Sequence, residues 1–190
     1  NPYTPNAGAR PPALIGRDEQ IEGFRLLLAR LSKGRSERSM IITGLRGVGK
    51  TVLLGRFRGI AIEQGWTVVE WEVSKHDETA FRRAVAREFR TALFSLSPRA
   101  RWRERLQRAA GVLRSFTLSI DPEGALTAGL GEPVDEGVAS SGDLAADLTQ
   151  LLIAVGEAAS EEGKGIVILL DEVQFLTQPQ LEALITGLHR

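Results

Sequence analysis

The sequence has 190 residues, with 24 basic and 24 acidic side chains that give a formal net charge of zero, and it contains no cysteine. This length predicts a single domain with a sizeable core, and the lack of cysteine excludes disulfides and thiolate metal sites. No apolar run approaches the roughly 18 residues of a membrane-spanning helix, and two histidines, His76 and His189, are too few for a histidine-rich zinc site. Residues 1–5 show neither a signal-peptide pattern nor an initiator Met. We therefore expect a cytoplasmic globular protein whose N-terminus has been trimmed.

The first predicted elements are an extended arm and a helix. Residues 1–13 are rich in proline, glycine and asparagine, which favour extended and turn conformations. From Asp18 onward apolar residues recur at helical spacing, and residues 33–36 carry the glycine and polar side chains that end a helix. The apolar face consists of Ile21, Phe24, Leu27, Leu28 and Leu31.

A phosphate-binding motif follows a strand predicted at about residues 39–43. Residues 44–51 match G-x-x-x-x-G-K-[ST] and lead into a helix predicted over about residues 50–64. Three glycines let backbone N–H groups wrap around phosphates, and the helix adds the positive end of its dipole. Lys50 supplies a full charge for the β and γ phosphates, and Thr51 supplies a hydroxyl for Mg²⁺. The predicted nucleotide-binding residues of this motif are Gly44, Leu45, Arg46, Gly47, Val48, Gly49, Lys50, Thr51 and Val52.

The chain after this helix is predicted to hold one strand and three helices. A turn at Gly65 precedes a run rich in β-formers, and three later stretches carry apolar residues at helical spacing. The predicted ranges are a strand over 66–73 and helices over about 78–95, 98–114 and 143–162, the second of them opened by Pro98.

A β-hairpin is predicted between the last two of these helices. Residues 116–120 alternate in polarity and precede a turn at residues 121–124, so they are placed to pair with residues 125–130. We interpret residues 115–142, approximately, as an insertion that carries this hairpin.

A second functional pattern is an apolar run that ends in two acidic residues. Residues 166–170 are Ile, Val, Ile, Leu and Leu, which favours a strand buried on both faces of a parallel sheet. Such sheets bind ligands at the carboxyl ends of their strands, so Asp171 is placed to hold Mg²⁺ directly or through water. Glu172 is placed to act as general base toward an attacking water. The predicted catalytic residues are therefore Glu172 and Lys50, and the predicted metal ligands are Thr51 and Asp171.

The last predicted element is a helix after the acidic pair. Thr177 is expected to be its N-cap, and Gln180, three residues on, completes a capping box. The sequence shows no internal repeat.

Charge is unevenly distributed along the chain. Residues 82–114 carry ten arginines and two glutamates, whereas residues 121–162 contain no Lys or Arg. A basic helical stretch of this kind can contact nucleic acid, but the favoured interpretation is a solvated surface that the following acidic segment partly neutralises. The sequence leaves both interpretations open.

Together with these motifs, residues 12–21, Pro-Ala-Leu-Ile-Gly-Arg-Asp-Glu-Gln-Ile, resemble the L-x-G-R-x-x-E segment that leads into AAA+ ATPases. The resemblance extends over roughly residues 11–190. It includes the order of the elements and the Asp171-Glu172 pair after the apolar run, which is the Walker B motif of these ATPases. More narrowly, the chain resembles bacterial ATP-binding proteins related to archaeal initiator (origin-recognition-like) ATPases and to STAND signalling ATPases. The resemblance implies a three-layer α/β/α P-loop NTPase fold with a mainly parallel sheet, which binds ATP or ADP with Mg²⁺. It also implies adenine or ribose contacts from Leu14, Ile15, Gly16 and Arg17.

The resemblance further implies the domain limits. Residues 1–17 form the arm and the nucleotide-contacting segment, and residues 18–190 form the ATPase core. Modules of this family continue past Walker B with a sensor-1 strand, an arginine finger and a helical lid, and the sensor-1 strand lies between the P-loop and Walker B strands. We therefore expect a core that is incomplete at its C-terminal end and hydrolyses ATP weakly by itself.

The favoured function is an AAA+-like ATPase module that couples its nucleotide state to a protein partner or an appended domain. One alternative, a STAND-type switch with slow hydrolysis, shares every motif. Another, a DNA-binding initiator-like ATPase, rests on the resemblance and on the arginine-rich stretch. A homo-oligomer is compatible with all three, and no feature indicates a membrane partner.

Overall fold

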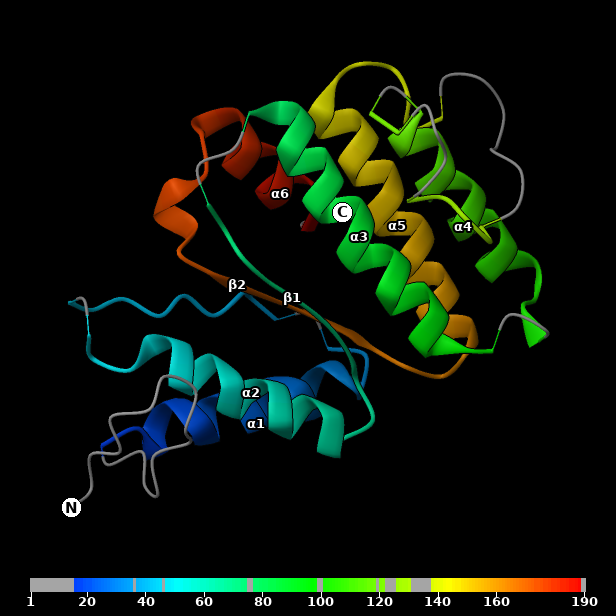
Figure 1. The fold of residues 1–190 in the computed structure, drawn as a ribbon. Helices are drawn as coiled ribbons and strands as arrows, with labels where there is room; N and C mark the ends of the chain where they lie inside the picture. The colour runs from blue at the N-terminus through cyan, green and yellow to red at the C-terminus, as the bar shows by residue number, and fades with distance from the viewer. Residues whose placement is uncertain are drawn as a thin grey trace. The chain divides into compact units, whose positions relative to one another are not determined.

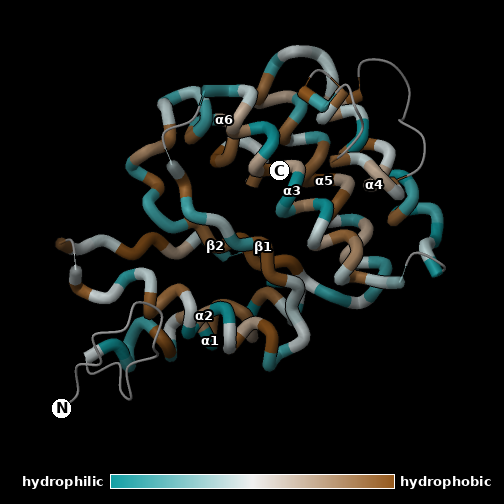
Figure 2. Tube along the Cα trace, viewed as in Figure 1, coloured by the Kyte–Doolittle hydropathy of each residue, from teal (hydrophilic) through white to brown (hydrophobic). Residues whose placement is uncertain are grey.

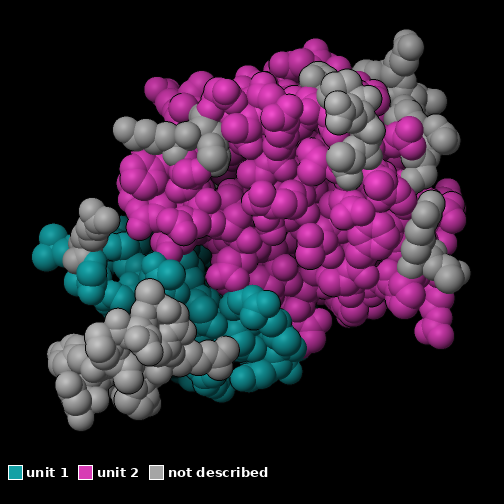
Figure 3. All heavy atoms as spheres, in the orientation of Figure 1, with its two compact units in different colours: residues 1–64 teal, residues 65–190 magenta. Residues whose placement is uncertain are grey.

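The computed structural model describes residues 16–35, 37–45, 47–74, 77–98, 101–118, 120–121, 126–130 and 138–188. Within these residues the chain forms helices α1 to α6, strands β1 and β2, and a short 3₁₀ helix, η2 (Figure 1). The chain divides into two compact units, residues 1–64 and residues 65–190 (Figure 3), and each unit is described by itself.

The first unit is built on two helices that share an aromatic stack. Helix α1 spans Asp18–Leu31 and helix α2 spans Lys50–Glu63, which confirms both predicted helices. The rings of Phe24 in α1 and Phe57 in α2 are stacked, with centroids 4.3 Å apart and planes at 11°, and both side chains are buried. Aromatic pairs of this kind add ~0.5–1.5 kcal/mol beyond the area that they bury. The stack therefore fixes α1 against α2.

The strand predicted at residues 39–43 is wrong. Residues 37–45 are described, and none of them is in a strand. In the described part of the chain the sheet contains β1 and β2 alone, so this run has no strand neighbour there. Its backbone gains no ladder hydrogen bonds, and the side chain of Ile41 is 79% exposed. An apolar run has the composition of a buried strand, but pairing is what makes it one.

The second unit contains a parallel sheet. Strand β1 spans Thr67–Glu72 and strand β2 spans Ile166–Asp171, in register from Thr67 opposite Ile166 to Glu72 opposite Asp171. The hydrophobic run of β2 is visible in Figure 2. Because the strands are parallel, Glu72 and Asp171 lie at the same edge of the sheet. This confirms both predicted strands and their parallel arrangement.

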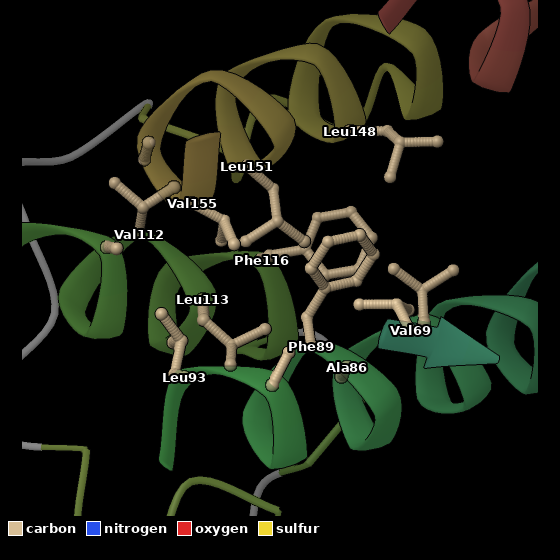
Figure 4. Packing of buried hydrophobic residues seen from close by; sticks show 14 of the residues in the cluster. Val69, Ala86, Phe89, Leu93, Val112, Leu113, Phe116, Leu148, Leu151 and Val155 are labelled. Atoms are coloured by element: carbon tan, nitrogen blue, oxygen red, sulfur yellow. The ribbon is translucent and has the colours of Figure 1, made fainter. Parts of the chain in front are cut away.

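Helices and one face of this sheet enclose the core of the second unit. Side chains of three helices converge on Val69 of β1, among them Phe89, Phe116 and Leu151 (Figure 4). Burial of large apolar side chains, at about 1.5–3 kcal/mol each, is the main stabilising term of such a core. The helices of this unit are α3 (Glu78–Leu96), α4 (Glu104–Thr117), α5 (Leu144–Glu161) and α6 (Gln178–Leu188). In the described residues, no helix is long and apolar enough to cross a membrane.

The predicted β-hairpin is also wrong. Among its residues the structure describes 116–118, 120–121 and 126–130, and these are in helix, turn or irregular structure rather than in strands. Phe116 is buried on the core face of α4, where it continues the helical spacing of the residues before it. Phe116 and Ile120 are four residues apart, so the spacing that suggested strand alternation also fits a helical i, i+4 repeat.

Side-chain caps explain where several of these helices begin. Asp143 accepts hydrogen bonds from backbone N–H groups in the first turn of α5, as an N-cap does. The N–H of Thr177 donates to Oε1 of Gln180 at 3.0 Å, which is one half of the predicted capping box. One predicted start is wrong, since α4 begins at Glu104 and not at Pro98.

Candidate functional site

The phosphate-binding motif forms a loop that runs directly into α2. Gly47 has φ of +81° and Gly49 has φ of +80°, in the left-handed region that glycine adopts at little cost. Gly49 is the N-cap residue of α2, so Lys50 opens the helix. The N–H groups of the first helical turn have no intrahelical partner and carry the positive end of the dipole. The loop therefore ends at a group of donors suited to an anion.

The ammonium of Lys50 lies inside this loop. Its Nζ donates to the carbonyl oxygen of Gly44 at 3.0 Å and to that of Leu45 at 2.9 Å. An ammonium has three N–H donors, and these two bonds use two of them. They hold a full positive charge within the loop, where a polyphosphate is the ligand that it complements.

The remaining predicted residues of the motif lie near the start of α2 or outside the described residues. Thr51 and Val52 belong to the first turn of α2, and both are exposed. A hydroxyl at this place would suit Mg²⁺, because Mg²⁺ takes oxygen ligands. Arg46, Leu14 and Ile15 lie outside the described residues.

Arg17 connects the segment before α1 with the loop. It is the N-cap residue of α1, and its Nη2 donates to the carbonyl oxygen of Val48 at 2.8 Å. Gly16 precedes it with φ of +76°. The structure thus brings one of the four predicted adenine-side residues, Arg17, into contact with the phosphate-binding motif.

The acidic pair lies at the carboxyl end of β2. Asp171 is the last residue of the strand, and its Oδ1 accepts a hydrogen bond from the N–H of Glu172 at 2.9 Å. Glu172 has φ of 57° and ψ of 36°, which is left-handed backbone for a residue with a side chain. Such a conformation costs ~1–2 kcal/mol. It turns the chain sharply after the strand, and strain of this kind concentrates at functional sites.

Sequence reasoning missed one residue of this group, Gln174. Its Nε2 donates to Oε2 of Glu172 across the 3₁₀ turn η2, Val173–Phe175. The bond is local and lies within one turn, so it holds the Glu172 carboxylate in one orientation. The available signal was a side-chain amide two residues after the predicted base.

The two halves of the candidate site belong to different units. The loop, Lys50 and Arg17 are in residues 1–64, and the acidic pair with Gln174 is in residues 65–190. The structure therefore shows two separately built groups: a cationic loop at a helix N-terminus, and two carboxylates at a strand end.

A cationic glycine loop and an acidic strand end occur together in P-loop ATPases, and comparison of the sequence with family models agrees. The model of the AAA ATPase domain matches residues 13–190. The chain belongs to the AAA ATPase domain family. Comparison with curated proteins and with solved structures gives no match. Family membership shows that this is an AAA+-type module with a P-loop NTPase fold, of the nucleotide-binding ATPase class.

In this AAA ATPase domain, part of the arginine-rich stretch serves the fold. Arg82 is buried and forms ion pairs with Glu78 and Asp147. Arg83 donates to the carbonyl of Ile120, and Arg90 donates to the carbonyl of Ala128. Asp147 belongs to the acidic segment that follows, so its pairing with Arg82 neutralises part of the stretch within the domain.

Proposed function

We propose that this domain binds Mg-ATP and hydrolyses it, and that its nucleotide state is coupled to a protein partner or an appended domain. The observation that carries the proposal is the ammonium of Lys50, held within a glycine loop at the N-terminus of α2. Three sources of positive potential meet there: the charge of Lys50, the backbone N–H groups of the loop and the helix dipole.

The loop binds the phosphates. Residues 44–52 surround them with backbone N–H donors, and Lys50 exchanges its bonds to the loop carbonyls for bonds to the β and γ phosphates. That exchange is favourable because a charged oxygen is a stronger acceptor than a peptide carbonyl. Thr51, in the first turn of α2, supplies its hydroxyl to Mg²⁺.

The acidic pair supplies the metal-binding and catalytic carboxylates. Asp171 would hold Mg²⁺ directly or through a water, and a bound Mg²⁺ would supply positive charge to the phosphates. Glu172 accepts the proton of the attacking water, as a general base. The bond from Gln174 supports this role, because it orients the carboxylate before the substrate binds.

The segment before α1 contacts the nucleoside. Leu14 and Ile15 form an apolar wall for adenine, and Gly16 lets the backbone come close to the base or ribose. The bond between Arg17 and Val48 supports this placement, since it ties the segment to the loop. A nucleotide-bound crystal structure with adenine far from residues 14–17 would contradict it.

Calorimetric titration with Mg-ATP and Mg-ADP tests the proposal. Lys50→Ala should weaken binding of both by about a hundredfold or more, because two charge-assisted bonds to phosphate are lost. Lys33→Ala is the matched control, since Lys33 is an exposed lysine in the same unit. Equal affinities of the parent and Lys50→Ala, or no binding by either, would refute the proposed site.

The coupling to a partner has its own test. The rate of ADP release is compared with the rate of ATP turnover, each with and without candidate partners. Release that is fast and stimulated by a partner indicates a motor. Tightly retained ADP that is released only on a signal indicates a nucleotide-gated switch.

A further inference from the structure

A single charged hydrogen bond joins Arg17 to the phosphate-binding loop. Nη2 of Arg17 donates to the carbonyl oxygen of Val48 at 2.8 Å, across 31 residues of sequence. The backbone of Arg17 is itself fixed, because its carbonyl accepts the first helical bond of α1, from the N–H of Ile21 at 3.0 Å.

Both residues of this hydrogen bond lie at or next to the ends of packed helices. Arg17 is the N-cap of α1, and Val48 lies two residues before α2. The two helices are held together by the buried stack of Phe24 on Phe57. The guanidinium is therefore presented to the loop by a packed scaffold and not by a free arm.

The geometry of the peptide bond gives this contact a consequence. The carbonyl of Val48 and the N–H of Gly49 belong to one planar trans peptide, so they point in opposite directions. A guanidinium that holds the carbonyl on one side therefore keeps the N–H turned toward the other side.

Without such a hold this peptide could flip at little cost. A flip of this peptide changes ψ of Val48 and φ of Gly49, and Gly49 has φ of +80°. Glycine populates positive and negative φ about equally well. A flipped peptide would present a carbonyl where a phosphate requires a donor.

We propose that Arg17 is a positioning residue of the phosphate-binding loop: by holding the carbonyl of Val48, it keeps the N–H of Gly49 directed at the phosphate side. Arg17 acts through the peptide and makes no bond to phosphate itself. The inference rests on the proposed nucleotide site, and it assigns a role in the loop to a residue expected only at the adenine or ribose side.

The first test needs no nucleotide. ¹⁵N relaxation of the nucleotide-free protein is compared for the parent, Arg17→Ala and the control Arg25→Ala, in which an exposed arginine of α1 is removed. In Arg17→Ala the order parameter of the Gly49 amide should fall below about 0.6, the range of flexible backbone, while amides within α1 and α2 keep their values. An unchanged Gly49 amide overturns the proposal, whether or not the protein binds nucleotide.

The second test separates positioning from direct contact. Dissociation constants are measured for Mg-ATP, Mg-ADP and adenosine, and Arg17→Ala should weaken the two phosphate-bearing ligands by about tenfold, the value of one charged hydrogen bond at the low end of its range. Adenosine binding should be unchanged. An equal loss for adenosine means that Arg17 contacts the nucleoside, and it overturns the proposal.

Raising the salt concentration distinguishes the hydrogen bond between Arg17 and the Val48 carbonyl from a direct attraction between Arg17 and phosphate. A through-space attraction between an exposed guanidinium and phosphate is screened when the ionic strength is raised, because the Debye length falls to about 3 Å at 1 M. The ratio of the parent and Arg17→Ala dissociation constants should persist at high salt. A ratio that falls to one overturns the proposal, whereas loss of binding by the parent protein contradicts the nucleotide site itself.

Discussion

The guanidinium of Arg82 in α3 lies 3.0 Å from the carboxylate of Asp147 in α5, and the pair is almost completely buried, with side-chain exposures of 6% and 1%. Asp147 also accepts hydrogen bonds from the backbone N–H and the hydroxyl of Ser141. The guanidinium of Arg82 lies over the ring of Phe116 in α4, 5.0 Å from its centroid. One ion pair thus connects three helices and the loop before α5.

The first prediction is that Arg82→Met strongly destabilises the second unit. The change keeps an apolar side chain over Phe116 but leaves the carboxylate of Asp147 buried without a counter-ion. Breaking a buried pair in this way costs about 3–5 kcal/mol. Chemical denaturation of the parent and the variant measures the loss.

The matched control is Arg87→Met, also in α3. Arg87 pairs with the neighbouring Glu88, but its side chain is 65% exposed. Surface pairs of this kind contribute ~0–1 kcal/mol. Equal losses in the free energy of unfolding for the two variants would show that the buried pair contributes no more to stability than the exposed pair.

This pair also shows what the sequence could not predict. Helical spacing predicted α3 and α5, but nothing in the sequence indicated that Arg82 and Asp147, 65 residues apart, would meet. Arginine composition alone left a nucleic-acid surface and a solvated surface open. Burial of one arginine is a property of tertiary packing, which spacing within a helix does not encode.

The predictions that failed depended on pairing between distant segments. The apolar composition of residues 39–43 fits a strand, but a strand needs a neighbour, and the described residues provide none. The hairpin prediction relied on alternation at Phe116, and packing of that ring in the helical core decides against it. Motif spacing, by contrast, correctly predicted a helix start at Lys50 and a strand end at Asp171, because each motif is local.

The second prediction concerns the backbone of Glu172. Glu172→Gly should stabilise the second unit by about 1 kcal/mol, because glycine accepts the left-handed conformation that glutamate adopts at a cost. The variant lacks the proposed base, so stability and activity should change in opposite directions. Glu157→Gly is the control: it places glycine at an exposed site inside α5, where the expected effect is a loss of about 1 kcal/mol. A loss of stability in Glu172→Gly would contradict the strained conformation.

The third prediction concerns metal removal. Mg-ATP at about 100 times its dissociation constant should stabilise the protein by ~2.7 kcal/mol. Chelation of Mg²⁺ should remove part of this stabilisation in the parent, because the proposed metal ligands would then have no Mg²⁺ to hold. In Asp171→Asn, Mg-ATP should stabilise the protein less than in the parent even before chelation, and the chelator should then remove less of that stabilisation. Thermal unfolding measures both, and a full response in Asp171→Asn would rule out its role as metal ligand.

The last prediction separates binding from chemistry at Glu172. Glu172→Gln preserves the size of the side chain and an oxygen that can accept the bond from Gln174, but the neutral amide cannot take up the proton of water. Mg-ATP affinity should therefore stay within about twofold of the parent, while the rate of hydrolysis falls by ~10²–10⁴-fold, as for loss of a general base. Single-turnover assays with protein in excess over ATP are suited to this test, because they detect even slow hydrolysis.

Two further variants test whether the loss of hydrolysis rate is specific to Glu172. Glu157→Gln removes an exposed carboxylate in α5 and should leave the single-turnover rate unchanged. Gln174→Ala retains the base but releases its carboxylate from the amide of Gln174, so the rate should fall less than in Glu172→Gln. Hydrolysis by Glu172→Gln at the parental rate would exclude Glu172 as the base. A loss of rate in Gln174→Ala as large as that in Glu172→Gln would instead indicate that Gln174 takes part in the reaction itself. If Gln174 only orients the carboxylate, its removal leaves a mobile carboxylate that still accepts the proton in some of its conformations.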